Sequence, residues 1–226
     1  QGMVLLRNEG GTLPLRAPAK LALFGNTSYR MITGGTGSGD VNEAYTVSLV
    51  EGLKAAGLAV DGALAEGYET FLAAEEKKQP APARPFQPKP PIPERAVVAD
   101  EIARGAREAD AALVTLGRNA GEGRARKVED DFLLPAAERA LLQDVATAFH
   151  AQKKKVVVVL NIGGVIETAS WRDVPDAILL AWQPGQESGH AIAEVLTGRT
   201  PPSGKLASTF PMKWEDVPSS ANFPGK

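Results

Sequence analysis

The sequence predicts a three-layer αβα sandwich around a mostly parallel sheet. Short apolar runs that do not alternate with polar residues are separated by amphipathic stretches, and the 226 residues suit one large domain or two small ones. Apolar runs without alternation are typical of parallel strands that are covered on both faces. Strands that alternate with helices along the chain imply an open parallel sheet with helices on both sides.

Four apolar runs are expected to form buried strands, at 21–24, 111–116, 156–160 and 178–180. The run Lys153 to Lys155 comes directly before the third and is interpreted as its solvated entrance. Residues with helical spacing lie between the runs. Glycine at 57 is a suitable C-cap for the first helix, and proline at 135 suits the first turn of the third. The expected helices cover 46–56, 94–109, 135–150 and 185–196.

One proline-dense segment interrupts this rhythm. Residues 79–93 (QPAPARPFQPKPPIP) cannot sustain a helix or a central strand. We expect an extended, polyproline-like crossover on the surface. A binding site for SH3-type domains is the alternative, but such segments more often serve as stiff connections within a domain.

Composition excludes several classes of function. A net charge of -2 does not favour binding to nucleic acid or to an anionic membrane surface. Without cysteine there is no disulfide, thiolate metal site or cysteine nucleophile, and two distant histidines without HExxH spacing make a zinc site unexpected. No apolar stretch reaches the roughly 18 residues of a membrane span. The start, Gln1-Gly2-Met3-Val4, is neither an initiator methionine nor a signal peptide, so we expect an internal piece of a longer protein.

A first glycine-rich loop, GGTGSGD at 34–40, suggests phosphate binding because glycine lets backbone N–H groups approach an anion. Its spacing argues against this, because it matches neither GxxxxGK[ST] nor GxGxxG, and it follows the nearest strand only after about nine residues. A serine hydrolase elbow of the GxSxG type is also absent, since Ser38 lies directly between two glycines. A nucleotide site or a nucleophilic serine is therefore not expected.

A second loop, NAGEG at 119–123, carries a single carboxylate between two glycines. This residue, Glu122, comes just after the carboxyl end of the expected strand 111–116, where open parallel sheets bind their ligands. Small neighbours leave a carboxylate free to reach into a cleft. Taken alone, this spacing also fits a solvated loop glutamate.

Several stretches together resemble the second domain of family 3 glycoside hydrolases, the β-glucosidase-like enzymes. GMVLLRNEGGTLPL is similar to the linker into that domain, and KLALFGN with GGTGSGDV to its first strand and GxGSG loop. AGEGRARK with DFLL resembles the SGEG loop and the stretch after it. The most specific likeness is the closing stretch at 170–211. The resemblance implies a linker at 1–19, the sandwich at 20–211 with its crossover at 79–93, and a C-terminal extension at 212–226.

The resemblance also implies a retaining mechanism with two carboxylates from two domains. An aspartate on a preceding (β/α)8 barrel would attack the anomeric carbon, and Glu122 would be the acid/base. Ser38 matches a position that contacts the sugar in the −1 subsite. Arg124 stands where many β-glucosidases carry an aromatic residue, so it would favour a polar or acidic aglycone. No metal or organic cofactor is implied; the expected partners are a β-glycoside substrate and the missing barrel.

Two other classes of function fit the sequence less well. A stand-alone carbohydrate-binding module needs exposed aromatic residues in a groove, but aromatics make up only 6% of the chain and its tryptophans mostly adjoin apparent core strands. A nucleotide-binding domain lacks its fingerprint, as argued above. Trp182, Gln186 and Glu187 are interpreted as a packed structural motif. The sequence leaves the sugar, the linkage and the oligomeric state open. It leaves the compartment open too, although the resemblance favours a periplasmic or secreted location over a cytoplasmic one.

Overall fold

A computed structural model describes residues 2–80, 89–122 and 125–222 and has a sheet at its centre. The described strands lie in the order β1-β6-β5-β4-β2-β3, and only β1 runs antiparallel to its neighbour. The longest pairing joins β4 and β5, from Ala111 opposite Lys155 to Arg118 opposite Ile162. The strands are β1 (Val4–Asn8), β2 (Lys20–Phe24), β3 (Ala59–Val60), β4 (Ala111–Arg118), β5 (Lys155–Ile162) and β6 (Ala177–Leu180).

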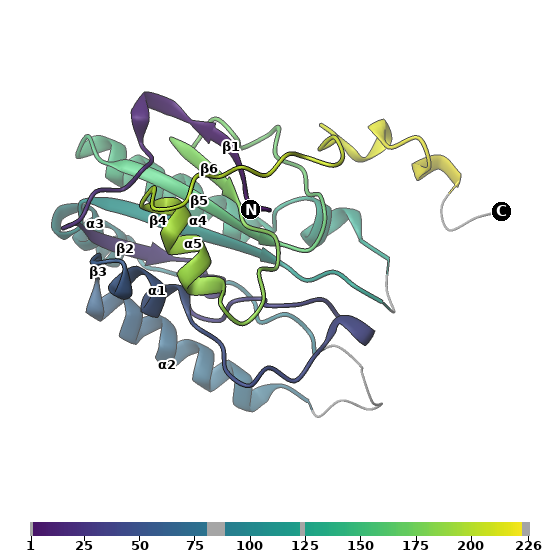
Figure 1. The fold of residues 1–226 in the computed structure, drawn as a ribbon, viewed down its shortest axis with the longest axis horizontal. Helices are drawn as coiled ribbons and strands as arrows, with labels where there is room; N and C mark the ends of the chain where they lie inside the picture. Colours follow the sequence, from purple (N-terminus) through teal and green to yellow (C-terminus); the bar gives the residue numbers. More distant parts are fainter. Residues whose placement is uncertain (1, 81–88, 123–124, 223–226) are drawn as a thin grey trace.

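Helices cover both faces of this sheet, which confirms the predicted three-layer sandwich (Figure 1). Helices α1 and α5 pack side by side on one face, while α3 and α4 pack together against β2, β4 and β5 on the other. Helix α2 lies along the β2–β3 side (Figure 1). Their bounds are α1 (Leu49–Ala55), α2 (Gly62–Lys78), α3 (Ala99–Glu108), α4 (Ala136–Ala151) and α5 (Ser188–Leu196).

The core follows from the apolar runs of the central strands. Every residue of β5 from Val156 to Ile162 is buried, and Phe24 of β2 meets Phe149 of α4 edge to face at 6.1 Å. Each such side chain contributes about 1.5 to 3 kcal/mol by leaving water. On the other face, a Cβ at Gly52 would lie 2.1 Å from the Gly189 backbone, so the close packing of α1 on α5 requires glycine.

The structure contains elements that the sequence analysis missed. Residues 1–19, expected as a linker, include β1, which extends the sheet beside β6. Helix α2 and the two-residue strand β3 were also not predicted. Conversely, α3 begins at Ala99 and not at 94, because Glu94 turns inward to Asn26 and Val98, just before the helix, is extended. Residues 81–88 of the crossover expected at 79–93 lie outside the described residues. The four predicted strands are all present.

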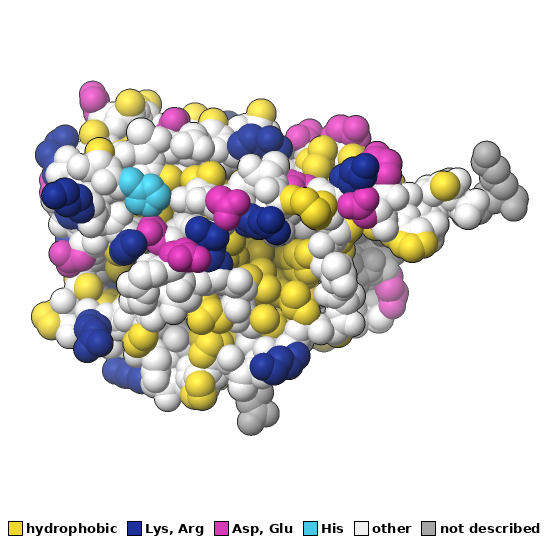
Figure 2. All heavy atoms as spheres, turned by 90° about the horizontal axis from the view of Figure 1, so that it is seen from above, with side chains coloured by type: hydrophobic (Ala, Val, Ile, Leu, Met, Phe, Trp, Pro, Cys, Tyr) yellow, Lys and Arg dark blue, Asp and Glu magenta, His cyan; other side chains and the backbone are white. Residues whose placement is uncertain are grey.

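The described C-terminal residues run away from the body of the molecule (Figure 1). Two aromatic contacts attach this segment. The ring centroids of Phe210 and Trp182 lie 6.4 Å apart, and those of Trp214 and Phe132 lie 5.5 Å apart. Seen from above, apolar side chains gather in a hollow of the surface, with charged side chains beside it (Figure 2). Among the described helices, none has both the length and the apolar character needed to cross a bilayer.

Candidate active site

The two glycine-rich loops meet at the carboxyl edge of the sheet. The loop at 34–40 follows β2, and Glu122 follows β4, four residues after the strand ends at Arg118. These strands are parallel neighbours, so their following loops emerge at the same edge. The structure thus brings Ser38 and Glu122, both predicted site residues, into direct contact.

Backbone hydrogen bonds join the two loops. The Thr36 N–H donates to the Ala120 carbonyl at 3.1 Å, and the Glu122 N–H donates to the Thr36 carbonyl at 3.3 Å. The Thr36 hydroxyl donates to the Glu122 carbonyl at 3.0 Å. This short parallel bridge fixes the backbone on both sides of the glutamate side chain.

Glycine permits this close approach. A Cβ at Gly37 would lie 2.6 Å from the Glu122 Cβ, and one at Gly121 would lie 2.3 Å from the Thr36 nitrogen. A Cβ at Gly35 would lie 2.8 Å from the Ala120 carbonyl oxygen. Gly37 also has φ +70°, a conformation that side chains disfavour. The glycine richness that suggested a phosphate loop therefore serves the packing of one loop on the other.

The Glu122 carboxylate is exposed and is bound by Ser38. The Ser38 hydroxyl donates to Oε1, and the Ser38 N–H donates to Oε2 at 3.4 Å. These hydrogen bonds stabilise the ionised form and lower the pKa of Glu122 below its ordinary value. Within this chain the carboxyl group is therefore held as a base; an apolar wall or a second negative charge would be needed to make it an acid at neutral pH.

A buried ion pair anchors the base of the Glu122 loop. Arg118, the last residue of β4, donates to both carboxylate oxygens of Glu138 at 2.8 and 2.7 Å and to the Asp131 carbonyl at 3.1 Å. The Asp131 carboxylate in turn accepts from Arg126 at 2.6 Å and from the Lys127 N–H at 3.1 Å. The first end of the loop thus attaches to α4 through Glu138, and the second attaches to the turn at Val128–Phe132 through Asp131.

Sequence reasoning missed the residues that support this loop. Thr36, Arg118 and Gln183 carried no assigned role. Thr36 lies in the glycine-rich loop, well past the end of β2, whereas Arg118 ends β4 and Gln183 follows β6 closely, each at the carboxyl end of a parallel strand. That position was the available signal. Arg124, expected at the aglycone side, lies outside the described residues.

Of the residues expected to form a packed motif after β6, Trp182 and Gln186 are half-buried and Glu187 is exposed. The Gln186 carbonyl accepts from the Val47 N–H at 2.8 Å. Glu187 stands just before α5 and accepts from the Tyr45 hydroxyl at 2.5 Å; it also contacts His190 at 2.7 Å. These contacts tie the loop that precedes α1 to the start of α5.

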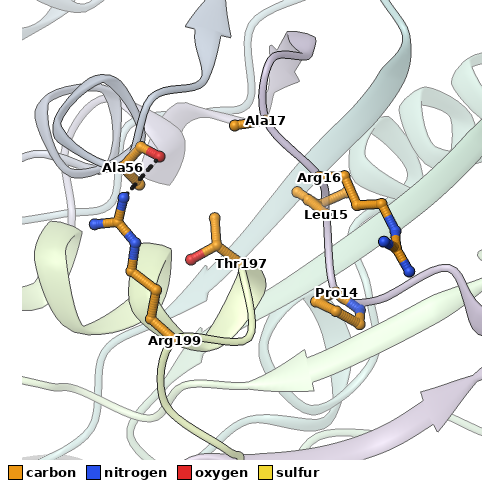
Figure 3. A pocket seen from close by; sticks show the side chains of 7 residues that line it. All are labelled: Pro14, Leu15, Arg16, Ala17, Ala56, Thr197 and Arg199. Carbon is orange, nitrogen blue, oxygen red and sulfur yellow. Dashed lines mark hydrogen bonds between the residues drawn. The ribbon is translucent and has the colours of Figure 1, made fainter.

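A cavity of about 460 Å³ lies at the opposite edge of the sheet, where α1 and α5 end. Arg199 reaches across it to the Ala56 carbonyl, while the Arg16 side chain points away (Figure 3). The cavity therefore adds nothing to the Glu122 site. Its lining residues are Pro14, Leu15, Arg16, Ala17, Ala56, Thr197 and Arg199. No group of three or more His, Asp or Glu side chains within the described ranges could hold a metal ion.

Comparison with known proteins gives one family. Residues 3–225 match the family described as "Glycosyl hydrolase family 3 C-terminal domain". The chain is 34% identical to beta-glucosidase A of Butyrivibrio fibrisolvens, covering 99% of this chain and 29% of that protein. It is 31% identical to an exo-alpha-(1->6)-L-arabinopyranosidase of Bifidobacterium longum, covering 100% of this chain and 28% of that protein.

A solved structure has the same fold. Beta-glucosidase 3B from Thermotoga neapolitana, in complex with alpha-D-glucose, superimposes with a TM-score of 0.92 and is 46% identical. The match covers 99% of this chain and 31% of that one. The chain thus spans about a third or less of the length of these relatives.

Proposed function

This chain belongs to glycosyl hydrolase family 3 as its C-terminal domain, and we propose that Glu122 is the general acid/base of a retaining, exo-acting β-glycosidase. The observation that carries the proposal is the junction of the two loops. It presents one exposed carboxylate, braced by backbone on both sides, at the edge of the sheet where ligands bind.

In this mechanism the Glu122 carboxyl first donates its proton to the glycosidic oxygen as the bond to the anomeric carbon breaks. An aspartate of the barrel domain, outside this chain, forms the covalent glycosyl-enzyme. Ionised Glu122 then removes a proton from water as the water displaces that aspartate. The two carboxyl groups of a retaining enzyme lie about 5 Å apart. The barrel domain would thus bring both the nucleophile and the negative charge that raises the pKa of Glu122.

Ser38 and Arg124 complete the proposed substrate contacts. The Ser38 hydroxyl can exchange its bond to Glu122 for one to a sugar hydroxyl in the −1 subsite. Arg124, two residues after Glu122, would face the aglycone with a guanidinium suited to hydroxyl pairs or a carboxylate. Arg124→Tyr in the full-length enzyme should then change the relative kcat/KM of disaccharides and aryl glycosides by roughly 1 kcal/mol or more.

The substrate class is a terminal β-glycoside, or a glycoside of another sugar whose ring has the same geometry. Relatives bear the names beta-glucosidase and alpha-L-arabinopyranosidase, so family membership leaves the sugar open. The proposed partner is the barrel domain of the same protein, consistent with the small share of each relative that this chain spans.

The test is Glu122→Ala in the full-length enzyme, with Glu129→Ala, an exposed glutamate after the same loop, as the matched control. Loss of general-acid help should lower kcat/KM for disaccharides by about 10² to 10⁴. For 2,4-dinitrophenyl glycosides, whose leaving group needs no proton, kcat/KM should change little. Azide should restore turnover and give a β-glycosyl azide. An Glu122→Ala enzyme with the parent's activity on disaccharides would refute the assignment.

A further inference from the structure

We propose that Gln183 is a positioning residue that holds the two loops of the active site in register. The inference rests on the proposed function of Glu122, because the exact position of the Glu122 loop affects the rate only if Glu122 is the acid/base. Gln183 follows β6, which is parallel to β5 and so also contributes its loop to this edge of the sheet.

One side-chain amide reaches both loops. The Gln183 Nε2 donates to the Gly34 carbonyl at 3.1 Å and to Asn119 Oδ1 at 3.0 Å. Gly34 begins the loop that carries Ser38, and Asn119 begins the loop that carries Glu122. An amide nitrogen has two hydrogens, so both are used, one on each loop. The bridge sits at the base of the loops, and Thr36 joins them nearer their tips.

The backbone before Gln183 is held in an unusual conformation. Trp182 has φ +60°, which a residue other than glycine adopts only when its surroundings impose it. The Trp182 carbonyl accepts from the buried Asn161 Nδ2 at 2.8 Å, and the same nitrogen donates to the Ile32 carbonyl at 2.9 Å. The turn is thus tied to the centre of the sheet, and it directs the following side chain between the loops.

Space for the amide comes from a glycine after β5. A Cβ at Gly163 would lie 2.6 Å from Gln183 Oε1 and 2.7 Å from the Ala120 Cβ. Gly163 is itself fixed, since its N–H donates to the Arg118 carbonyl at 2.9 Å. Three segments from different parts of the chain therefore meet around Gln183.

This arrangement matters because Glu122 is exposed and its side chain depends on the loop for its aim. A shift of about 1 Å in a catalytic group can lower a rate about 10²-fold. Gln183 contacts the loops and not the reacting atoms, so its effect should appear in the step that requires Glu122 as acid.

The experiment is Gln183→Met in the full-length enzyme, a change that keeps the length of the side chain and removes both donors. We expect kcat/KM for disaccharides to fall about 10- to 10²-fold. For 2,4-dinitrophenyl glycosides the fall should be at least ten times smaller. Gln152→Met, at the exposed end of α4, is the matched control and should change neither.

Asn119→Ala provides the second variant. It removes the acceptor on the Glu122 side only, and combined with Gln183→Met it should give less than the product of the two single losses, because both break one bridge. If Gln183→Met does not fold, Asn119→Ala alone must show the same leaving-group dependence. Equal losses for good and poor leaving groups, or fully multiplicative losses, would overturn the inference. Glu122→Ala without leaving-group dependence would instead refute the proposed function.

Discussion

Glu94 is a half-buried carboxyl group at the carboxyl end of β2, outside the candidate active site. Its Oε2 accepts from the Asn26 N–H at 3.0 Å, and its Oε1 accepts from the Arg95 N–H at 3.1 Å. Burial raises the pKa of Glu94 to about 7; the Asn26 hydrogen bond opposes this rise, and the nearby charge of Glu138 adds to it. The Glu94 carboxyl group therefore attaches the end of the proline-dense segment to the loop that follows β2.

Glu94→Gln should make the stability of the chain less dependent on pH. The unfolded carboxyl loses its proton near pH 4.5, but the folded one keeps it up to about pH 7. Stability therefore falls as the pH rises through this window, and the glutamine variant should avoid about 1 to 3 kcal/mol of that fall. The measurement is the free energy of unfolding by urea from pH 4 to 8. Parallel curves for the parent and Glu94→Gln would contradict the prediction; Glu66→Gln, an exposed glutamate on α2, is the control.

At the residue scale the sequence could predict candidate site residues, but it could not predict the hydrogen bonds that hold them in place. Glu122 and Ser38 could be predicted as site residues from the resemblance of their motifs to family 3 glycoside hydrolases, and Glu122 stands in addition just after a parallel strand. The bridge through Thr36 and the brace through Gln183 could not, because they join residues far apart in the chain. Trp182 was predicted to belong to a packed motif, but its left-handed backbone is held by a hydrogen bond from Asn161, which no local pattern reveals.

Among the elements, α2 depends most clearly on its N-cap residue, Asp61. Asp61 is buried, caps the helix by accepting from the Leu64 N–H at 2.9 Å, and pairs with Lys20 at 3.0 Å and Arg104 at 3.6 Å. Burial alone would raise the pKa of Asp61, but the Leu64 hydrogen bond and the two cations lower it. One side chain thus joins α2, β2 and α3.

Asp61→Ala should destabilise the chain by about 2 to 4 kcal/mol, because it removes the cap and leaves two cations without this partner. Asp61→Asn keeps an acceptor for the cap and should lose less. Ser48→Ala, which removes the exposed cap of α1, is the comparison and should lose about 1 kcal/mol. Denaturant unfolding of the three variants gives the order. Equal losses for Asp61→Ala and Ser48→Ala would mean that the ion pairs contribute nothing.

Strands with a long apolar run and helices with clear helical spacing could be predicted, and elements without either could not. Strands β2, β4, β5 and β6 are apolar over most of their buried lengths; the buried polar residues are Thr115, Arg118 and Asn161, near the carboxyl ends of β4 and β5. Helix α2 buries only Leu64, Tyr68 and Leu72 along its 17 residues, which leaves a weak pattern. Strand β1 lies at the edge and is half-buried, so its sequence does not differ from that of a linker. Its place is decided by pairing with β6, 170 residues later in the chain.

At the scale of the whole molecule, the carboxylate of the proposed acid, Glu122, is bound by Ser38 of the neighbouring loop. Ser38 lowers the pKa of Glu122, and the glutamate is exposed, so the chain alone holds it in the ionised form. A general acid for glycoside cleavage needs the opposite environment. The fold thus positions the Glu122 side chain, and the proposed barrel domain supplies the negative charge that raises its pKa.

The chain by itself should therefore not hydrolyse p-nitrophenyl glycosides of any common sugar. One carboxyl group cannot carry out double displacement, because nothing on the opposite face of the sugar ring attacks the anomeric carbon. The assay compares the pure, folded chain with the full-length enzyme at equal molarity. The Glu122→Ala chain is the control for contaminants, since a co-purifying glycosidase would be equally active in both preparations. Turnover that survives a second purification and disappears in Glu122→Ala would show that this domain holds a complete site, and the division of the two carboxylates between two domains would be wrong.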